Sequence, residues 1–250
     1  PAWDLFPLDQ YFRLADFFGV HRGRSMPVLA TRGCPYRCSF CSSPQMWTTR
    51  YVTREPEDVV DEIVDYIERY GVENVNFADL TAITKRQWTL RFCDALERRA
   101  PGLRWQLPVG TRAEALDQEV LQRLFETGCR NIPYAPEAGG RRMLEVYDKR
   151  VDLERLVDSL ATAHRVGLVV KLNVIVGHPE ERWGDLARSL LLLVRAALRG
   201  ADDAAVMMFG PYPGSADFDA LVRSGAITLD DEYAYTALSW SSGLHRSYNP

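Results

Sequence analysis

The sequence CPYRCSFC, which runs from Cys34 to Cys41, places three thiols within eight residues. The chain has only two further cysteines, Cys93 and Cys129, and both are far from this stretch. The total of five is odd, which is not typical of a framework of disulfides. The stretch is therefore interpreted as a place where thiols bind a metal or carry redox chemistry.

The composition is that of a globular protein. The chain has 250 residues, of which 46% are hydrophobic and 26% are charged, so it can bury the core of one large domain or two small ones. Its formal net charge of −4 gives no electrostatic footprint for nucleic acid, and we do not expect it to bind one. The longest apolar stretches, 168–177 and 190–198, are too short for a membrane span, and we expect a cytoplasmic protein.

Short apolar or β-branched runs alternate with amphipathic segments along the chain. In one such segment, residues 55–71, acids occupy the first turn and Gly71 follows the end, as is typical of a helix. The alternation favours a parallel sheet with right-handed crossovers, either open and doubly wound or an incomplete barrel of βα units. In both architectures, functional residues gather at the carboxyl ends of the strands. The six predicted strands are Pro27–Thr31, Val72–Phe77, Leu103–Val109, Arg130–Tyr134, Leu168–Val176 and Ala204–Phe209.

The three-thiol stretch directly follows the first predicted strand, and its spacing limits the chemistry. A structural zinc ion takes four ligands, and no nearby His or Cys completes a set with Cys34, Cys38 and Cys41. A redox pair of the C-x-x-C kind leaves Cys34 unexplained. A 4Fe–4S cluster held by three thiolates accounts for all of them and leaves one iron open. For these three cysteines, zinc binding or a role as core thiols stays the alternative. The two distant cysteines, Cys93 and Cys129, are interpreted as core residues.

The pattern Cys34-x-x-x-Cys38-x-x-Cys41, with Phe40 before the last cysteine, resembles the signature of the radical SAM superfamily, and the resemblance extends along essentially the whole chain. It implies an α/β fold, a partial (β/α)6 barrel of the TIM type with a parallel sheet. It also implies a 4Fe–4S cluster whose open iron binds S-adenosylmethionine, and an electron that cleaves the sulfonium to a 5′-deoxyadenosyl radical. The partners it implies are a small-molecule substrate and an electron donor such as flavodoxin or ferredoxin.

The ends of the later predicted strands resemble further motifs of that family, and each implies a contact with S-adenosylmethionine. Asp79 in FADLT stands where relatives bind the methionyl amino group, although the usual glycines are missing. Arg112 in GTR is expected to bind the ligand carboxylate, because a guanidinium binds carboxylates as a fork. Glu137 in APEAGG is expected to accept from the ribose hydroxyls, and Phe40 is included among the cofactor-binding residues.

The stretch NVIVGHPEE, after the fifth predicted strand, resembles the Gly-x-Ile-x-Gly-x-x-Glu motif of the family. Asn173 stands in place of the first glycine. The match implies that Ile175 packs on the adenine, that Gly177 turns the chain and that Glu180 supports the loop. His178 is interpreted as a loop or packing residue, and the sequence identifies no catalytic residue.

The first residues, PAWDLFPLDQYF, resemble the connector between a cobalamin-binding domain and the radical core in the cobalamin-dependent class. That class includes methyltransferases and the anaerobic cyclase of bacteriochlorophyll synthesis. The implied domains are a connector at 1–26, a radical SAM core at 27–225 and a C-terminal extension at 226–250. The cobalamin motif Asp-x-His-x-x-Gly is absent, so cobalamin is expected only through a domain outside this chain.

The resulting hypothesis is a radical SAM enzyme core for cobalamin-assisted methylation, or a related radical transformation, of a small molecule. A cobalamin-independent radical SAM enzyme, such as a tRNA methylthiotransferase, is the first alternative, and the net charge of −4 counts against RNA binding. A non-catalytic iron–sulfur or zinc protein is the second alternative.

Overall fold

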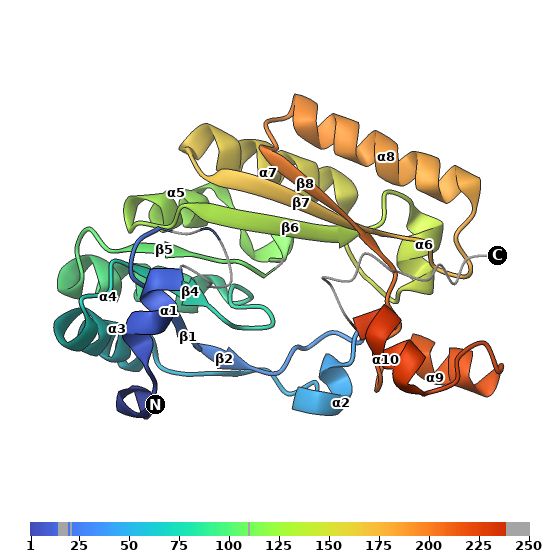
Figure 1. The fold of residues 1–250 in the computed structure, drawn as a ribbon. Coiled ribbons are helices and arrows are strands. Elements are labelled where there is room, and N and C mark those ends of the chain that lie inside the picture. Colours follow the sequence, from blue (N-terminus) through green and yellow to red (C-terminus); the bar gives the residue numbers. More distant parts are fainter. Residues whose placement is uncertain (15–19, 21, 110, 239–250) are drawn as a thin grey trace.

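The computed structural model describes residues 1–14, 20, 22–109 and 111–238, so parts of the expected connector and C-terminal extension lie outside the described residues. Its centre is a set of parallel strands that follow one another in chain order (Figure 1). Parallel bridges from Trp105 to Cys129 and from Thr111 to Tyr134 connect the two halves of this set. These strands are β1 (Ser25–Val28), β4 (Asn74–Phe77), β5 (Arg104–Gln106), β6 (Asn131–Glu137), β7 (Val169–Val176) and β8 (Asp203–Met208).

This arrangement confirms the predicted partial barrel with a parallel sheet. β1 pairs with β4, β4 with β5, β6 with β7, and β7 with β8, always in the parallel sense. Among the described strands β8 does not pair with β1, so the barrel stays open on that side. Parallel pairing brings the carboxyl ends of all these strands to one end of the molecule.

Helices carry the crossovers between these strands. α3 shows why they form where they do, since Pro56 occupies its first turn and Gly71 ends it with φ of 62°. The crossover helices are α3 (Pro56–Tyr70), α4 (Arg86–Arg99), α5 (Gln118–Glu126), α6 (Arg141–Val146), α7 (Leu153–Val166) and α8 (Trp183–Leu198). The other elements are η1 (Trp3–Leu5), α1 (Leu8–Leu14), β2 (Thr31–Arg32), α2 (Ser43–Trp47), β3 (Val52–Thr53), η2 (Ala113–Ala115), α9 (Ala216–Arg223) and α10 (Asp231–Leu238).

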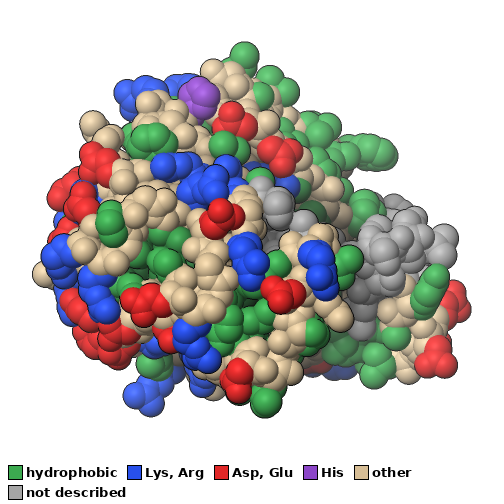
Figure 2. Space-filling model, turned by 60° about the vertical axis from the view of Figure 1, so that its left-hand side comes forward, with side chains coloured by type: hydrophobic (Ala, Val, Ile, Leu, Met, Phe, Trp, Pro, Cys, Tyr) green, Lys and Arg blue, Asp and Glu red, His purple; other side chains and the backbone are tan. Residues whose placement is uncertain are grey.

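The face formed by α3, α4 and α5 carries mixed charge. Arg123 lies 2.9 Å from Asp94 and 2.8 Å from Glu97, and Arg91 lies 2.9 Å from Glu55. Figure 2 shows basic and acidic side chains intermixed over this face rather than a stripe of one sign. Within the described part of the chain, no helix is both long enough and apolar enough to cross a bilayer.

Several strand bounds differ from the prediction. β1 ends at Val28 and β5 at Gln106, before their predicted ends, whereas β6 continues past its predicted end at Tyr134 through Pro136 to Glu137. A shift in the β6–β7 register falls between Tyr134 and Glu137, and proline is tolerated in a ladder at such irregularities. The antiparallel ribbon of β2 and β3 was not predicted, because strands of two residues are too short to show alternation.

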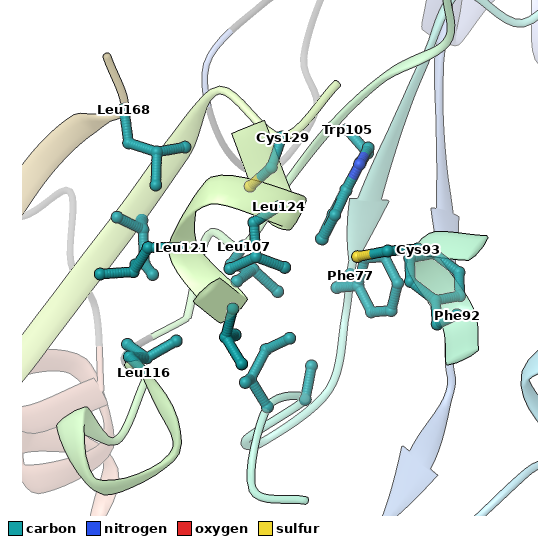
Figure 3. Packing of buried hydrophobic residues seen from close by; sticks show 14 of the residues in the cluster. Phe77, Phe92, Cys93, Trp105, Leu107, Leu116, Leu121, Leu124, Cys129 and Leu168 are labelled. Atoms are coloured by element: carbon teal, nitrogen blue, oxygen red, sulfur yellow. The ribbon is translucent and has the colours of Figure 1, made fainter. Parts of the chain in front are cut away.

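The main hydrophobic core contains a cluster of aromatic rings. The centroids of Phe77, Phe92 and Trp105 lie 5.3–5.4 Å apart in each pair, with the rings tilted or edge to face (Figure 3). Cys93 and Cys129 are fully buried in the same packing. Their interpretation as core residues is thereby confirmed.

We expect Trp105→Ala to lower the free energy of unfolding by about 3–5 kcal/mol. The change removes a fully buried ring and takes the indole donor from the backbone oxygen of Thr127. Trp183→Ala is the matched control, because Trp183 is 87% exposed, and it should change the free energy by less than about 0.5 kcal/mol. Denaturant unfolding followed by circular dichroism measures both, and equal losses would contradict this account of the core.

Candidate functional site

Residues 34–41, the cysteine loop, lie between β2 and α2 at the carboxyl end of β1. All three thiols of the loop are partly buried. Burial raises the pKa of Cys34 and Cys38, and the charge of a Cys41 thiolate raises the pKa of both further. The three thiols thus share one short, partly buried loop, an arrangement that suits ligands of one metal centre.

The surroundings of Cys41 fit a metal-bound thiolate. Its Sγ accepts from the backbone N–H of Ser43 at 3.4 Å and lies 3.1 Å from Ser43 Oγ, whose hydroxyl can turn to donate once the thiol has lost its proton. Donors to a ligating sulfur are a recurrent feature of iron–sulfur sites. In the described residues, no three His, Cys, Asp or Glu side chains converge as the ligands of a single metal ion do. A cubane requires a different arrangement, because each thiolate binds its own iron.

Asp79 is buried behind the entrance to the cysteine loop. Its carboxylate accepts from the backbone N–H of Ala30 at 3.2 Å, and from the backbone N–H and the hydroxyl of Thr31, both at 2.5 Å. Burial raises the pKa of Asp79, and these hydrogen bonds oppose the increase. The carboxylate therefore holds the chain that leads into the loop, while its contact with a methionyl ammonium stays a prediction.

Arg112 faces the cysteine loop, as expected. Its guanidinium carbon lies 3.5 Å from the centroid of the Tyr36 ring, between the first two cysteines. The same guanidinium donates to the backbone oxygen of Arg150 at 2.6 Å, and the residue is 7% exposed. Stacking and burial hold this cation in a fixed place beside the loop.

Glu137 ends β6 and forms a buried ion pair with a residue that the sequence reading missed. The Lys149 ammonium lies 2.7 Å from Glu137 Oε1, and each side chain is less than 10% exposed. Lys149 Nζ also lies 5.8 Å from the centroid of the Phe40 ring. Lys149 follows the short helix α6 rather than a strand, so the strand ends alone do not point to it.

Phe40 and Ile175 meet in a small hydrophobic cluster under the cysteine loop. Phe40 packs against this cluster, and its ring centroid lies 5.3 Å from that of Tyr147 in an edge-to-face contact. Ile175, on β7, is 8% exposed and belongs to the same cluster. The apolar surface expected for an adenine therefore lies next to the loop.

The turn after β7 agrees with the predicted motif except for its glutamate. Gly177 has φ of 84°, and its N–H donates to Glu181 Oε2 at 2.6 Å. The side chain that supports the turn is thus Glu181 and not Glu180, because the backbone direction brings the later residue back to the glycine. His178 is 4% exposed and packs its ring on Tyr147, which agrees with its interpretation as a packing residue.

Two further segments hold the middle of the loop. One of them is the α6 turn, residues 146–150. Its Tyr147 backbone oxygen accepts the Ser39 N–H at 3.0 Å, and its Val146 backbone oxygen accepts the Ser39 hydroxyl at 3.2 Å. From the other side, the backbone N–H of Asp217 in α9 donates to Ser39 O at 3.1 Å. α6 and α9 lie at the same end of the molecule as α2 in Figure 1. No sequence motif predicts either contact.

The family follows from this fold and loop. The family model of the radical SAM superfamily matches residues 28–193, a range that contains the cysteine loop and β4 to β7. The chain belongs to the radical SAM superfamily.

Relatives with known names are longer than this chain. The bacteriochlorophyllide d C-12(1)-methyltransferase of Chlorobaculum tepidum is 35% identical over 88% of this chain and 48% of its own length. The anaerobic magnesium-protoporphyrin IX monomethyl ester cyclase of Rubrivivax gelatinosus is 26% identical over 88% of this chain and 38% of its own length. The chain spans about half the length of the curated relatives it matches.

A solved structure shares the fold. It is the radical S-adenosylmethionine methyltransferase TsrM from Kitasatospora setae, with cobalamin and a 4Fe-4S cluster bound. The similarity covers 87% of this chain and 38% of that chain, with a TM-score of 0.71 and 19% sequence identity. At this identity the likeness supports the architecture alone.

We expect Asp79→Ala to lower the free energy of unfolding by about 2–4 kcal/mol, because the buried amides of Ala30 and Thr31 lose their charged acceptor. Thr31→Val removes only the hydroxyl donor and should cost about 1 kcal/mol. Hydrogen exchange at the amides of residues 30 and 31 should accelerate in the first variant much more than in the second. An Asp79→Ala protein as stable as the wild type would show that these bonds do not hold the loop entrance.

Proposed function

We propose that this chain is the core of a radical SAM enzyme in which Cys34, Cys38 and Cys41 hold a 4Fe–4S cluster and S-adenosylmethionine binds the open iron. The observation that carries the proposal is the position of three partly buried thiols on one loop, at the carboxyl ends of a parallel partial barrel and inside the family match. When bound, the cluster supplies the electron that cleaves the sulfonium of S-adenosylmethionine.

The residues of the chain would bind and orient that ligand. Arg112 offers a fixed guanidinium to the carboxylate, and Glu137 keeps its Oε2 for the ribose hydroxyls while Oε1 pairs with a lysine. Ile175 and Phe40 offer an apolar surface to the adenine. Gly177, in the left-handed region, lets the backbone turn closely around the ligand.

The radical chemistry serves, in this proposal, cobalamin-assisted methylation or a related transformation of a small molecule. The printed names of the relatives support it, since they include methyltransferases and an anaerobic cyclase. The proposed domains are a connector at 1–26, the core at 27–225 and an extension at 226–250. Cobalamin would be bound by a domain outside this chain, and a flavodoxin or ferredoxin would supply the electron.

We expect each of the variants Cys34→Ala, Cys38→Ala and Cys41→Ala to lose cluster assembly and cleavage of S-adenosylmethionine, because a cubane held by three thiolates cannot spare one. Cys93→Ala and Cys129→Ala are matched controls, and they should retain both, since their thiols are buried in the core. Iron and sulfide content after anaerobic reconstitution, and 5′-deoxyadenosine formed under reductant, measure the outcome. One zinc per chain without cleavage would instead identify a non-catalytic metal protein.

We expect the 250-residue chain to bind no cobalamin, because the cobalamin motif is absent from this sequence, and any longer natural form that carries the proposed cobalamin domain to bind it. Visible absorption of cobalamin that stays with the protein after gel filtration measures this directly. The short chain should still cleave S-adenosylmethionine, slowly and without coupling to product. If the longest natural form also binds none, a cobalamin-independent enzyme such as a methylthiotransferase becomes the better proposal.

A further inference from the structure

The ion pair between Glu137 and Lys149 is buried at the edge of the site. The two charged atoms lie 2.7 Å apart, with side-chain exposures of 9% and 8%. Burying such a pair is costly, and a pair of apolar residues of similar volume often serves stability as well or better. Stability alone therefore does not account for this pair.

The backbone around the pair is strained. Glu137 has φ of 69°, and Asp148, directly before Lys149, has φ of 44°. Only one other residue besides glycine, Thr48, adopts positive φ in the described part of the chain. Residues with a Cβ adopt this region at a cost, and such strain gathers at functional sites. Positive φ thus occurs at Glu137 itself and at the residue directly before Lys149, the two ends of the ion pair.

The ammonium end of the pair acts on the cysteine loop. Lys149 Nζ lies 5.8 Å from the ring centroid of Phe40, which directly precedes Cys41. Tyr147, two residues before Lys149, accepts the backbone N–H of Ser39 at 3.0 Å, so the segment that carries Lys149 is bonded to the cysteine loop. The positive charge is thus near enough to stabilise negative charge on the loop.

We propose that Lys149, held by Glu137, sets the reduction potential of the cluster, an inference that rests on the function proposed above. A reduced cluster carries one more negative charge than an oxidised one, so a fixed cation beside it favours reduction and raises the potential. Glu137 fixes the cation and opposes part of its effect. Lys149 is a positioning and tuning residue in this account, and Glu137 connects the ligand site to the cluster.

Variants at the two positions should shift the potential in opposite directions. Lys149→Met leaves the carboxylate unopposed and should lower the potential, whereas Glu137→Gln leaves the ammonium unopposed and should raise it. We expect each shift to be about tenfold in the reduction equilibrium, or about 59 mV for one electron. The double variant should lie between the two, and Lys149→Arg, which keeps the charge, should stay close to the wild type.

The experiment is a redox titration of the reconstituted cluster in the 250-residue chain, followed by electron paramagnetic resonance without S-adenosylmethionine. Lys171→Met is the matched control, because it also removes an ammonium from an ion pair. Lys171 on β7 lies 2.9 Å from Asp203, the first residue of β8, so this pair is away from the carboxyl ends of the strands. It should leave the potential unchanged.

Opposite shifts support the proposal. Shifts of the same sign, or no shift in either variant, overturn it, because loosening of the structure would move both in one direction. If Lys149→Met assembles no cluster, Glu137→Gln decides alone, and a potential that does not rise overturns the proposal. If the wild-type chain assembles no cluster, the proposed function is overturned as well. If the wild-type chain cleaves S-adenosylmethionine but its variants show no shift in potential, only the proposed role of Lys149 is overturned.

Discussion

The hydrogen bonds of the Asp79 carboxylate to Ala30 and Thr31 are the constraint on which the site depends. The parallel register of β1 and β4 pairs Val28 with Phe77, and this pairing brings Asp79 beside the chain as it leaves β1. The cysteine loop beyond has no strand or long helix of its own, so its backbone needs partners from elsewhere. Asp79 holds its entrance, and the α6 turn and α9 hold its middle through Ser39.

One hydrophobic cluster forms the main core of the fold, and a second, separate cluster supports the cysteine loop. The larger one packs α3, α4, α5 and α7 against the sheet and contains the aromatic rings around Trp105. The smaller one lies under the cysteine loop and joins Ile175, Tyr147 and Phe209 to Phe40. Because the loop rests on the smaller cluster, a change there alters the positions of the thiols with less effect on global stability than a change in the larger one.

The sequence predicted the strands and the residues that follow them, because strand periodicity and family motifs are local signals. Arg112 and Ile175, predicted in this way, lie beside the cysteine loop, and Glu137 pairs with Lys149 near Phe40, while their contacts with S-adenosylmethionine stay predictions. Lys149 was missed because it becomes relevant only after α6 folds back on β6. The prediction named Glu180 where the structure has Glu181 for a similar reason. Which of these neighbouring acids contacts Gly177 depends on the direction of the backbone after the glycine. Contacts between distant segments leave no local pattern to read.

The barrel is open between β1 and β8, because these two outer strands do not pair with each other among the described residues. Among the described residues β8 is an edge strand, with Val206 at 51% and Met208 at 41% exposure. An apolar edge tends to pair with other chains unless something covers it. Radical chemistry also needs a site from which water is excluded, and an open barrel does not exclude it by itself. If the proposed function is right, the opening through which a cofactor and a substrate would reach the cysteine loop is also the side that has to be covered, both for packing and for the chemistry.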